Sequence, residues 1–472
     1  MALAYAAMIA AAILLFFFIR ARGSSLVAPA PSGPVQFGSH AAGPQGDTFL
    51  HVLVAMVAII VTARLLGTLF KYLRQPPVIG EVIAGILLGP SLLGRVAPAA
   101  FNYLLPASVA PYLSVLAQVG VILFMFLIGL ELDTAKLRHG THATIAISHA
   151  SIVVPFLLGS ALALWIYPQL SSRDVPFTVF ALFMGVSMSV TAFPVLARIL
   201  TDRGLQRTPL GSIALTCAAV DDVTAWCLLA FVVSVVEARI GGAAHTVLLT
   251  LAYIVFVFVV VRPLIVRLAR AVDAKGRLTQ TATSIVLVAF LLSALATELI
   301  GIHAIFGAFL LGVVVPHTSL ISRELTHRLE DLVVILLLPI FFAFTGMRTQ
   351  IGLVQGTRQW LVCGAIMAVA CAGKFGGSLA AARLTGLPWR ESSALGVLMN
   401  TRGLMELIVL NIGLDLRVLS PTTFAMLVLM AVVTTVMTAP ILHFLEKGSE
   451  AATYGAVPGL AEAPAAGPVS AE

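Results

Sequence analysis

Apolar runs separated by short polar connections follow one another along most of the chain. Each run has about the length that a helix needs to cross the hydrocarbon core of a bilayer, roughly 20 residues. The pattern predicts an N-terminal hydrophobic helix within residues 2–19, for which a signal peptide is the alternative interpretation. A flexible Gly-, Pro- and Ser-rich linker follows and reaches residue 47. Beyond the linker it predicts thirteen further helices, at 48–70, 76–94, 112–132, 142–167, 175–200, 209–238, 246–270, 279–299, 301–318, 329–350, 357–383, 391–414 and 420–446.

Composition agrees with this pattern. Of the 472 residues, 60% are apolar and only 10% are charged, against about 45–50% apolar and ~25% charged in soluble domains. So few charges cannot solvate the surface of a soluble protein of this size, which excludes a soluble enzyme. The sequence therefore predicts an all-α polytopic membrane protein with thirteen transmembrane helices and one extra N-terminal helix.

The net charge of +7 comes from the connections between the predicted helices. Lys and Arg concentrate in alternate connections, seventeen in one set and six in the other. Because cytoplasmic loops carry the excess of Lys and Arg, we expect a multi-pass protein of the cell (inner) membrane with a cytoplasmic C-terminus. Residues 447–472 have the composition of a disordered tail. Without a βαβ pattern or a GxGxxG motif, we expect no nucleotide-binding regulatory domain, and no nucleic-acid partner.

The two halves of the chain share two motifs in the same order. Residues 76–90 align with 301–316, which places Gly85 opposite Gly307, and residues 124–133 align with 341–350. The paired helices are seven crossings apart, an odd number, so the halves have opposite orientations. Inverted repeats with discontinuous crossing helices are typical of secondary transporters. We therefore predict two inverted six-helix repeats joined by a linker helix at 246–270.

Three charged residues lie at the centres of predicted transmembrane helices: Asp221, Asp222 and Lys374. Each costs about 2.5–3.5 kcal/mol on an insertion scale, and such residues usually mark a functional site. A buried ion pair that only fixes helix packing is the alternative interpretation. Adjacent residues on a helix point about 100° apart, so the two aspartates cannot face the same partner. A carboxylate in such a site can bind either a proton or a hard cation.

Two predicted helices contain helix-breaking residues. Pro194 removes a backbone donor and disfavours helix at the residue before it, and Thr191 places a hydroxyl beside the carbonyls that this frees. In the second half the corresponding helix centre holds Asn400, Thr401, Arg402 and Gly403. Arg402 and Glu406 are four residues apart on one helix face. We interpret them as a structural ion pair, although they could also neutralise the ends of half-helices.

Over about residues 48–446 the chain resembles the cation:proton antiporter-2 family of monovalent cation/proton exchangers. The resemblance is carried by PPVIGEVIAGILLGP, FLIGLELD, TAFPVLARIL, the Asp221–Asp222 pair, LLPIFFAFTGM, Lys374 and MNTRGLMELIVLNIG. It implies that Asp222 is the carboxylate that binds ion and proton, that Asp221 pairs with Lys374, and that Thr191 lines the ion site. It also implies a scaffold and homodimer contact formed by helices 48–132 and 279–350, and a moving core formed by helices 142–238 and 357–446.

The expected function is secondary active antiport of Na⁺ or K⁺ against protons by alternating access. The resemblance implies that this exchange is electrogenic, because family members with paired aspartates generally are. We expect no cofactor, no catalytic residue and no metal apart from the transported cation. A cation channel without proton coupling is one alternative. An intramembrane aspartyl protease is another, but it needs its two aspartates on separate helices that face each other.

Overall fold

The computed structural model describes residues 2–26, 48–73, 75–131, 142–203, 205, 208–237 and 243–454. Within these ranges all regular structure is helical. The predicted linker beyond residue 26 and the predicted tail beyond residue 454 lie outside the described residues. Ten described helices are long and apolar enough to span a membrane, and Phe177–Ser189 and Ala304–Val314 are shorter apolar helices. The all-helical, multi-pass architecture predicted from the sequence is thus confirmed.

The first half contains α1 (Ala2–Gly23), α2 (Thr48–Tyr72), α3 (Pro77–Leu88), α4 (Leu93–Val96), α5 (Pro98–Leu104), α6 (Ala110–Glu131), α8 (His142–Leu170), α9 (Phe177–Ser189), α10 (Phe193–Asp202) and α11 (Pro209–Glu237). The remainder contains α12 (Ala243–Phe256), α13 (Arg262–Lys275), α14 (Gln280–Ile300), α15 (Ala304–Val314), α16 (Leu320–Leu332), α17 (Leu338–Arg348), α18 (Gly356–Cys371), α19 (Gly377–Leu384), α20 (Trp389–Met399), α21 (Leu404–Asp415) and α22 (Pro421–Tyr454).

Several helices differ from the predicted ones in detail. The predicted helices 175–200 and 391–414 are each divided, into α9 and α10 and into α20 and α21. Single π-helical turns join α12 to α13, α16 to α17 and α18 to α19. The last helix continues to Tyr454, beyond the predicted end at 446. Its final residues include glutamate and alanine, which favour helix, so composition alone placed the start of the tail too early.

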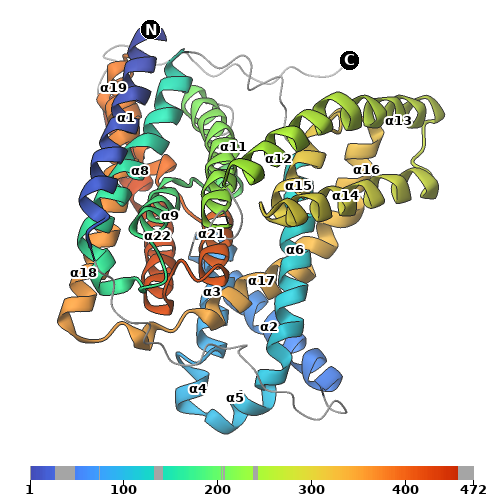
Figure 1. The fold of residues 1–472 in the computed structure, drawn as a ribbon, viewed down its shortest axis with the longest axis horizontal. Coiled ribbons are helices and arrows are strands. Elements are labelled where there is room, and N and C mark those ends of the chain that lie inside the picture. The colour runs from blue at the N-terminus through green and yellow to red at the C-terminus, as the bar shows by residue number, and fades with distance from the viewer. Residues whose placement is uncertain are drawn as a thin grey trace, which may run out of the picture.

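The helices gather into two groups that lie side by side in Figure 1. One group contains α8, α9, α18, α19 and α22, with α1 packed against α8 and α9. The other contains α2, α6, α14, α15 and α16. Helices α3, α17 and α21 meet in the middle of the view. The boundary between these groups, which we call the seam, passes close to the two divided helices.

Candidate ion-binding site

The two helix breaks meet in the interior of the protein. The chain leaves the helical conformation between α9 and α10, where Val190 is extended, and again between α20 and α21. The amide of Ala192 in the first break donates to the carbonyl of Thr401 in the second, over 3.0 Å. Pro194 is the second residue of α10, where a proline is tolerated because the first helical amides have no intrahelical acceptor. Its side chain lies outside the described part of the structure.

Asp221 on α11 is completely buried and surrounded by donors. Its Oδ1 accepts from the Ser148 hydroxyl at 2.6 Å, and its Oδ2 accepts from Thr191 Oγ1 at 2.8 Å and from the Ser151 hydroxyl. Lys374 Nζ lies 3.2 Å from the same Oδ2. Because a buried charge is tolerated only when it is paired and hydrogen-bonded, this set of donors stabilises Asp221 as an anion.

Lys374 reaches Asp221 from a π-helical turn, Ala372–Gly376, between α18 and α19. Its side chain is fully buried, and its ammonium donates to Thr191 Oγ1 at 2.5 Å as well as to Asp221. Single π turns inside helices occur often at functional sites, because they redirect a side chain. The structure thus joins Asp221, Thr191 and Lys374, which come from three separate segments, in one hydrogen-bonded group.

Asp222 has different surroundings, although it is the next residue. It is 4% exposed, and neither of its carboxylate oxygens has a hydrogen-bond partner among the described residues. It lies near the backbone of Phe193, the first residue of α10. The two aspartates therefore face different partners, as their 100° offset requires. Burying a carboxylate without a partner costs free energy, and a bound proton or cation would remove that cost.

Arg402 and Glu406 form a second fully buried ion pair, with 2.6 Å between Arg402 Nη1 and Glu406 Oε2. The guanidinium also donates to the carbonyls of Ser187 and Met188, each at 2.9 Å. These carbonyls belong to the last turn of α9, where the helix dipole is negative. Arg402 thus both pairs with Glu406 and caps the end of a half-helix, which combines the two interpretations that the sequence left open.

The other predicted residues of the second break have smaller parts in the geometry. The Asn400 amide donates to Cys371 Sγ at 3.6 Å, while Asn400 Oδ1 and Thr401 Oγ1 are buried without a partner among the described residues. Gly403 lies directly against the Val195 side chain, with no room for a Cβ atom. The second break therefore places unpartnered oxygens and a tightly packed glycine beside the first.

Ser148 and Ser151 are the site residues that sequence reasoning missed. Both lie on α8, three residues apart and fully buried, and both donate to Asp221. Serines at this spacing occupy one helix face, which was a usable signal. Serine is common in membrane helices, however, and nothing in the sequence distinguished this pair from serines that donate to their own helix backbone.

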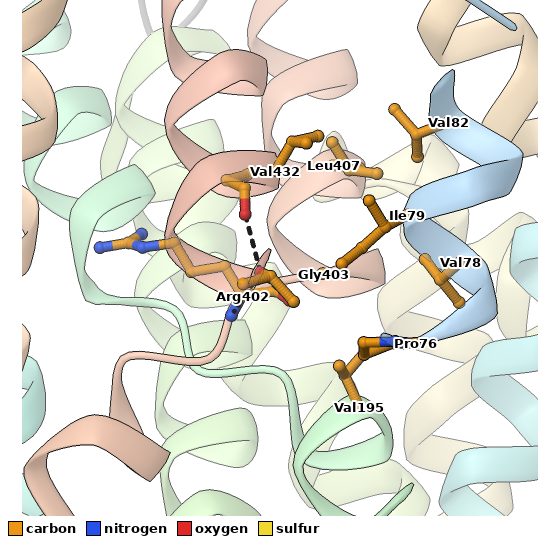
Figure 2. Close-up of a pocket in the computed structure, with 11 residues that line it drawn as sticks. Pro76, Val78, Ile79, Val82, Val195, Arg402, Gly403, Leu407 and Val432 are labelled. Atoms are coloured by element: carbon orange, nitrogen blue, oxygen red, sulfur yellow. Dashed lines mark hydrogen bonds between the residues drawn. The ribbon is translucent and has the colours of Figure 1, made fainter. Parts of the chain in front are cut away.

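Two adjoining cavities lie along the seam at one end of this site. A wide cavity of about 690 Å³ is lined by the end of α2, the start of α3, α10 and α22, including Lys71, Gln75 and His443. It adjoins a narrow crevice of about 20 Å³, which shares Pro76 with it and reaches Arg402 and Gly403. Apolar side chains such as Ile79, Val82 and Val432 line this crevice, and the Arg402 guanidinium points away from it (Figure 2). Access from this end is therefore constricted by apolar side chains.

Comparison with known proteins agrees with the sequence motifs. A family model described as the transmembrane sodium/hydrogen exchanger matches residues 57–445. The chain belongs to the sodium/hydrogen exchanger family. Membership makes it a transporter and not an enzyme, which removes the protease alternative. It also confirms the resemblance to cation:proton antiporters that the motifs indicated.

Relatives in this family are similar over most of the chain. The Na⁺/H⁺ antiporter NhaS4 of Synechocystis is 46% identical over 398 residues, covering 84% of this chain and 97% of that protein. Cation/H⁺ antiporter 20 of Arabidopsis thaliana is 40% identical over 420 residues, covering 85% of this chain and 50% of that protein. K⁺/H⁺ antiporter 1 of Saccharomyces cerevisiae is 36% identical over 396 residues, covering 82% and 45%. The chain thus spans nearly all of the first relative and about half of the other two.

Among solved structures, the sodium proton antiporter MjNhaP1 of Methanocaldococcus jannaschii has a TM-score of 0.62 at 12% sequence identity. The match covers 86% of this chain and 99% of the archaeal one. At that identity the likeness concerns the fold, and it agrees with the helical architecture described above.

Proposed function

We propose that the protein is a secondary active antiporter that exchanges a monovalent cation, Na⁺ or K⁺, for protons, with Asp222 as the shared binding group. The observation that carries this proposal is the contrast between a satisfied Asp221 and a buried, unpartnered Asp222 beside two helix breaks. Relatives named as Na⁺/H⁺ and K⁺/H⁺ antiporters support the reaction class but leave the choice of cation open.

Asp222 accepts one ligand at a time in this mechanism. A proton neutralises the carboxylate, whereas a cation needs its charge and further oxygen ligands. Unpartnered oxygens on the two breaks, Ser187 Oγ, Asn400 Oδ1 and Thr401 Oγ1, are available for that purpose, together with carbonyls freed at the breaks. Because proton and cation compete for one group, movement of one in one direction requires countertransport of the other.

The arrangement of the two helix groups supports transport by alternating access. We assign helices 142–238 and 357–446 to a moving core that carries the site, and 48–132 and 279–350 to a scaffold that also forms a homodimer contact. Helix 246–270 links the halves, residues 1–47 precede this domain, and 447–472 follow it. The wide cavity at one end of the seam and the constricted crevice beside Arg402 are consistent with a state closed around the site.

Glycine packing supports the inverted repeat, in a shifted register. Gly80 of α3 packs against the backbone of α2, and Gly307 of α15 packs against α14 in the same manner. Five residues later, Gly85 packs against α17 near Gly346, and Gly312 packs against Gly129 of α6. In the proposed repeat these contacts favour Gly312 over Gly307 as the counterpart of Gly85, with Gly129 opposite Gly346.

Electrogenic exchange is assigned to Lys374. When the site binds a cation and the contact with Asp221 opens, the ammonium loses its counter-charge and can release a proton. One more proton then moves in each cycle than an electroneutral exchange would carry. We place the protein in the cell (inner) membrane with its C-terminus in the cytoplasm, on the side of Lys71 and the wide cavity.

The test is cation-dependent proton flux in everted vesicles, with Na⁺, K⁺ and Li⁺ added in turn. Asp222→Asn keeps the shape of the side chain but can bind neither a proton nor a cation's charge, so flux is expected to vanish. Glu324→Gln is the matched control, because Glu324 is an exposed carboxylate on α16 that pairs only with Arg328 in the described structure. Normal exchange by the Asp222 variant overturns the assignment, and cation flux without proton coupling would favour the channel.

A further inference from the structure

A polar cluster joins the two sides of the seam far from the helix breaks. Arg348, at the end of α17, lies 2.5 Å from Asp415 Oδ1 at the end of α21. The same guanidinium donates to Asn411 Oδ1 at 3.0 Å. Asn411 in turn donates to Thr345 Oγ1 on α17 at 2.7 Å. Three contacts thus connect one helix assigned to the scaffold with one assigned to the core.

This cluster is stronger than an ordinary surface ion pair. The Arg348 side chain is 12% exposed, Asn411 is buried, and the guanidinium also lies 5.5 Å from the centre of the Phe344 ring. Charge-assisted bonds made through two nitrogens of one guanidinium combine strength with a fixed geometry. Because Asp415 remains 49% exposed, water can replace Arg348 as its partner when the helices separate.

The cluster lies at the opposite end of the seam from the wide cavity. Helices α3 and α17 run in the same direction, since Gly85 packs against Ala343 and Gly89 against Met347. Arg348 is therefore level with the end of α3, whereas Pro76, at its start, lines the wide cavity. Beside the cluster the seam narrows to a crevice of about 40 Å³ between α6, α15, α17 and α21. A wider cavity of about 550 Å³ lies at the same end, between the end of α3 and the start of α18. Each end of the seam thus combines a wide cavity with a narrow crevice.

We propose that Arg348, Asn411 and Asp415 form a latch that holds this end of the seam closed. The inference rests on the alternating access proposed above. Movement of α21 relative to α17 must break all three contacts before the site can open on the latch side. The latch therefore sets the balance between the two access states, and it takes no part in binding the cation.

Cysteine accessibility tests the latch without measuring transport. The background has its four native cysteines replaced by alanine. Ala117→Cys then serves as the latch-side reporter and Ala431→Cys as the reporter for the narrow crevice near Arg402, because each residue lines its crevice and is nearly inaccessible. We expect Asp415→Asn to raise the rate at which a membrane-impermeant thiol reagent labels the latch-side reporter by roughly fivefold, the factor that loss of about 1 kcal/mol produces. Labelling of the narrow-crevice reporter from the other side should fall.

Charge reversal separates a latch from a local packing defect. Arg348→Asp should raise labelling of the latch-side reporter further, because two carboxylates then face each other, and the exchanged pair R348D/D415R should bring it back toward the unmodified rate. Glu324→Gln, which breaks the exposed pair with Arg328 within α16, should leave both reporters unchanged.

Two outcomes overturn the latch: unchanged labelling of the latch-side reporter in Asp415→Asn, or no recovery in the exchanged pair. A rise at the latch-side reporter with no fall at the narrow-crevice reporter keeps the latch but contradicts alternating access. The failure of the latch and the failure of the proposed transport mechanism are therefore distinguishable.

Discussion

Two fully buried ion pairs lie beside the helix breaks, and they differ in what they connect. Arg402 and Glu406 are four residues apart, and Arg402 is tied to the carbonyls of Ser187 and Met188. Lys374 and Asp221 come from two different helices and lie next to the unpartnered Asp222. The first pair fixes one half-helix against another. The second pair, Lys374 and Asp221, is held by side chains that can separate. Although both pairs are equally buried, the first serves structure and the second, as we propose, serves transport.

The largest effect is expected on stability when the Arg402 pair is broken. Glu406→Gln leaves a buried guanidinium without its counter-charge, and loss of one partner of such a pair costs about 3–5 kcal/mol. Thermal unfolding of the purified protein in detergent should show a large fall in Tm or no folded protein. Arg328→Gln serves as the control, since that pair is 48% and 42% exposed and should shift stability by at most about 0.5 kcal/mol. A Glu406 variant as stable as the control would contradict the structural role.

Breaking the other pair should affect charge movement more than stability. Lys374→Gln leaves Asp221 with three hydroxyl donors, Ser148, Ser151 and Thr191, so the fold should persist. We expect currents on a solid-supported membrane to disappear. The double variant D221N/K374Q removes both charges and should leave exchange without current. Wild-type currents from Lys374→Gln would make this pair structural, like the first.

The proposed role of Asp222 predicts that cation exchange depends on pH. If proton and cation compete at Asp222, each unit of acidification below the site's pKa should raise the apparent KM for the cation by up to about tenfold, with little change in maximal rate. Initial proton fluxes measured over two pH units with a series of cation concentrations would test this. A KM independent of pH indicates separate sites.

The helix breaks were predictable from the sequence because they depend on local chemistry. Pro194 and the Asn400–Gly403 segment disfavour helix wherever they occur, and the structure ends α9 and α20 beside them. The contact between Asp221 and Lys374 required the family resemblance, since the two residues are 153 positions apart in the chain. The seam latch was not predicted, because Arg348 and Asp415 each lie at a helix end, where a charged residue ordinarily faces water.

The role of Ser148 and Ser151 could not be predicted from the sequence, because it depends on which neighbour their helix face points toward. Prediction of the repeat register was limited in a related way. Apolar glycine motifs can align with more than one offset, and packing favours Gly312 over Gly307 as the counterpart of Gly85 in the repeat that we propose. Short-range chemistry therefore located the helix breaks, whereas the neighbours of each side chain needed the tertiary fold.

The smallest expected effect comes from removing one hydroxyl donor of Asp221. It tests whether the Asp221–Lys374 pair serves transport, in contrast to the structural Arg402–Glu406 pair. Ser151→Ala removes one donor from Asp221 and leaves Ser148, Thr191 and Lys374 in place. Loss of one bond to a charged group costs about 1.5–3 kcal/mol at most, and remaining donors reduce that cost. A less stabilised Asp221 anion should hold Lys374 less tightly, so we expect a few-fold change in current per unit of exchange and an almost unchanged Tm. Ser160→Ala is the matched control, since Ser160 is a buried serine on the same helix that donates to the Ala181 carbonyl. If both variants change current equally, the hydroxyls around Asp221 have no special part in transport.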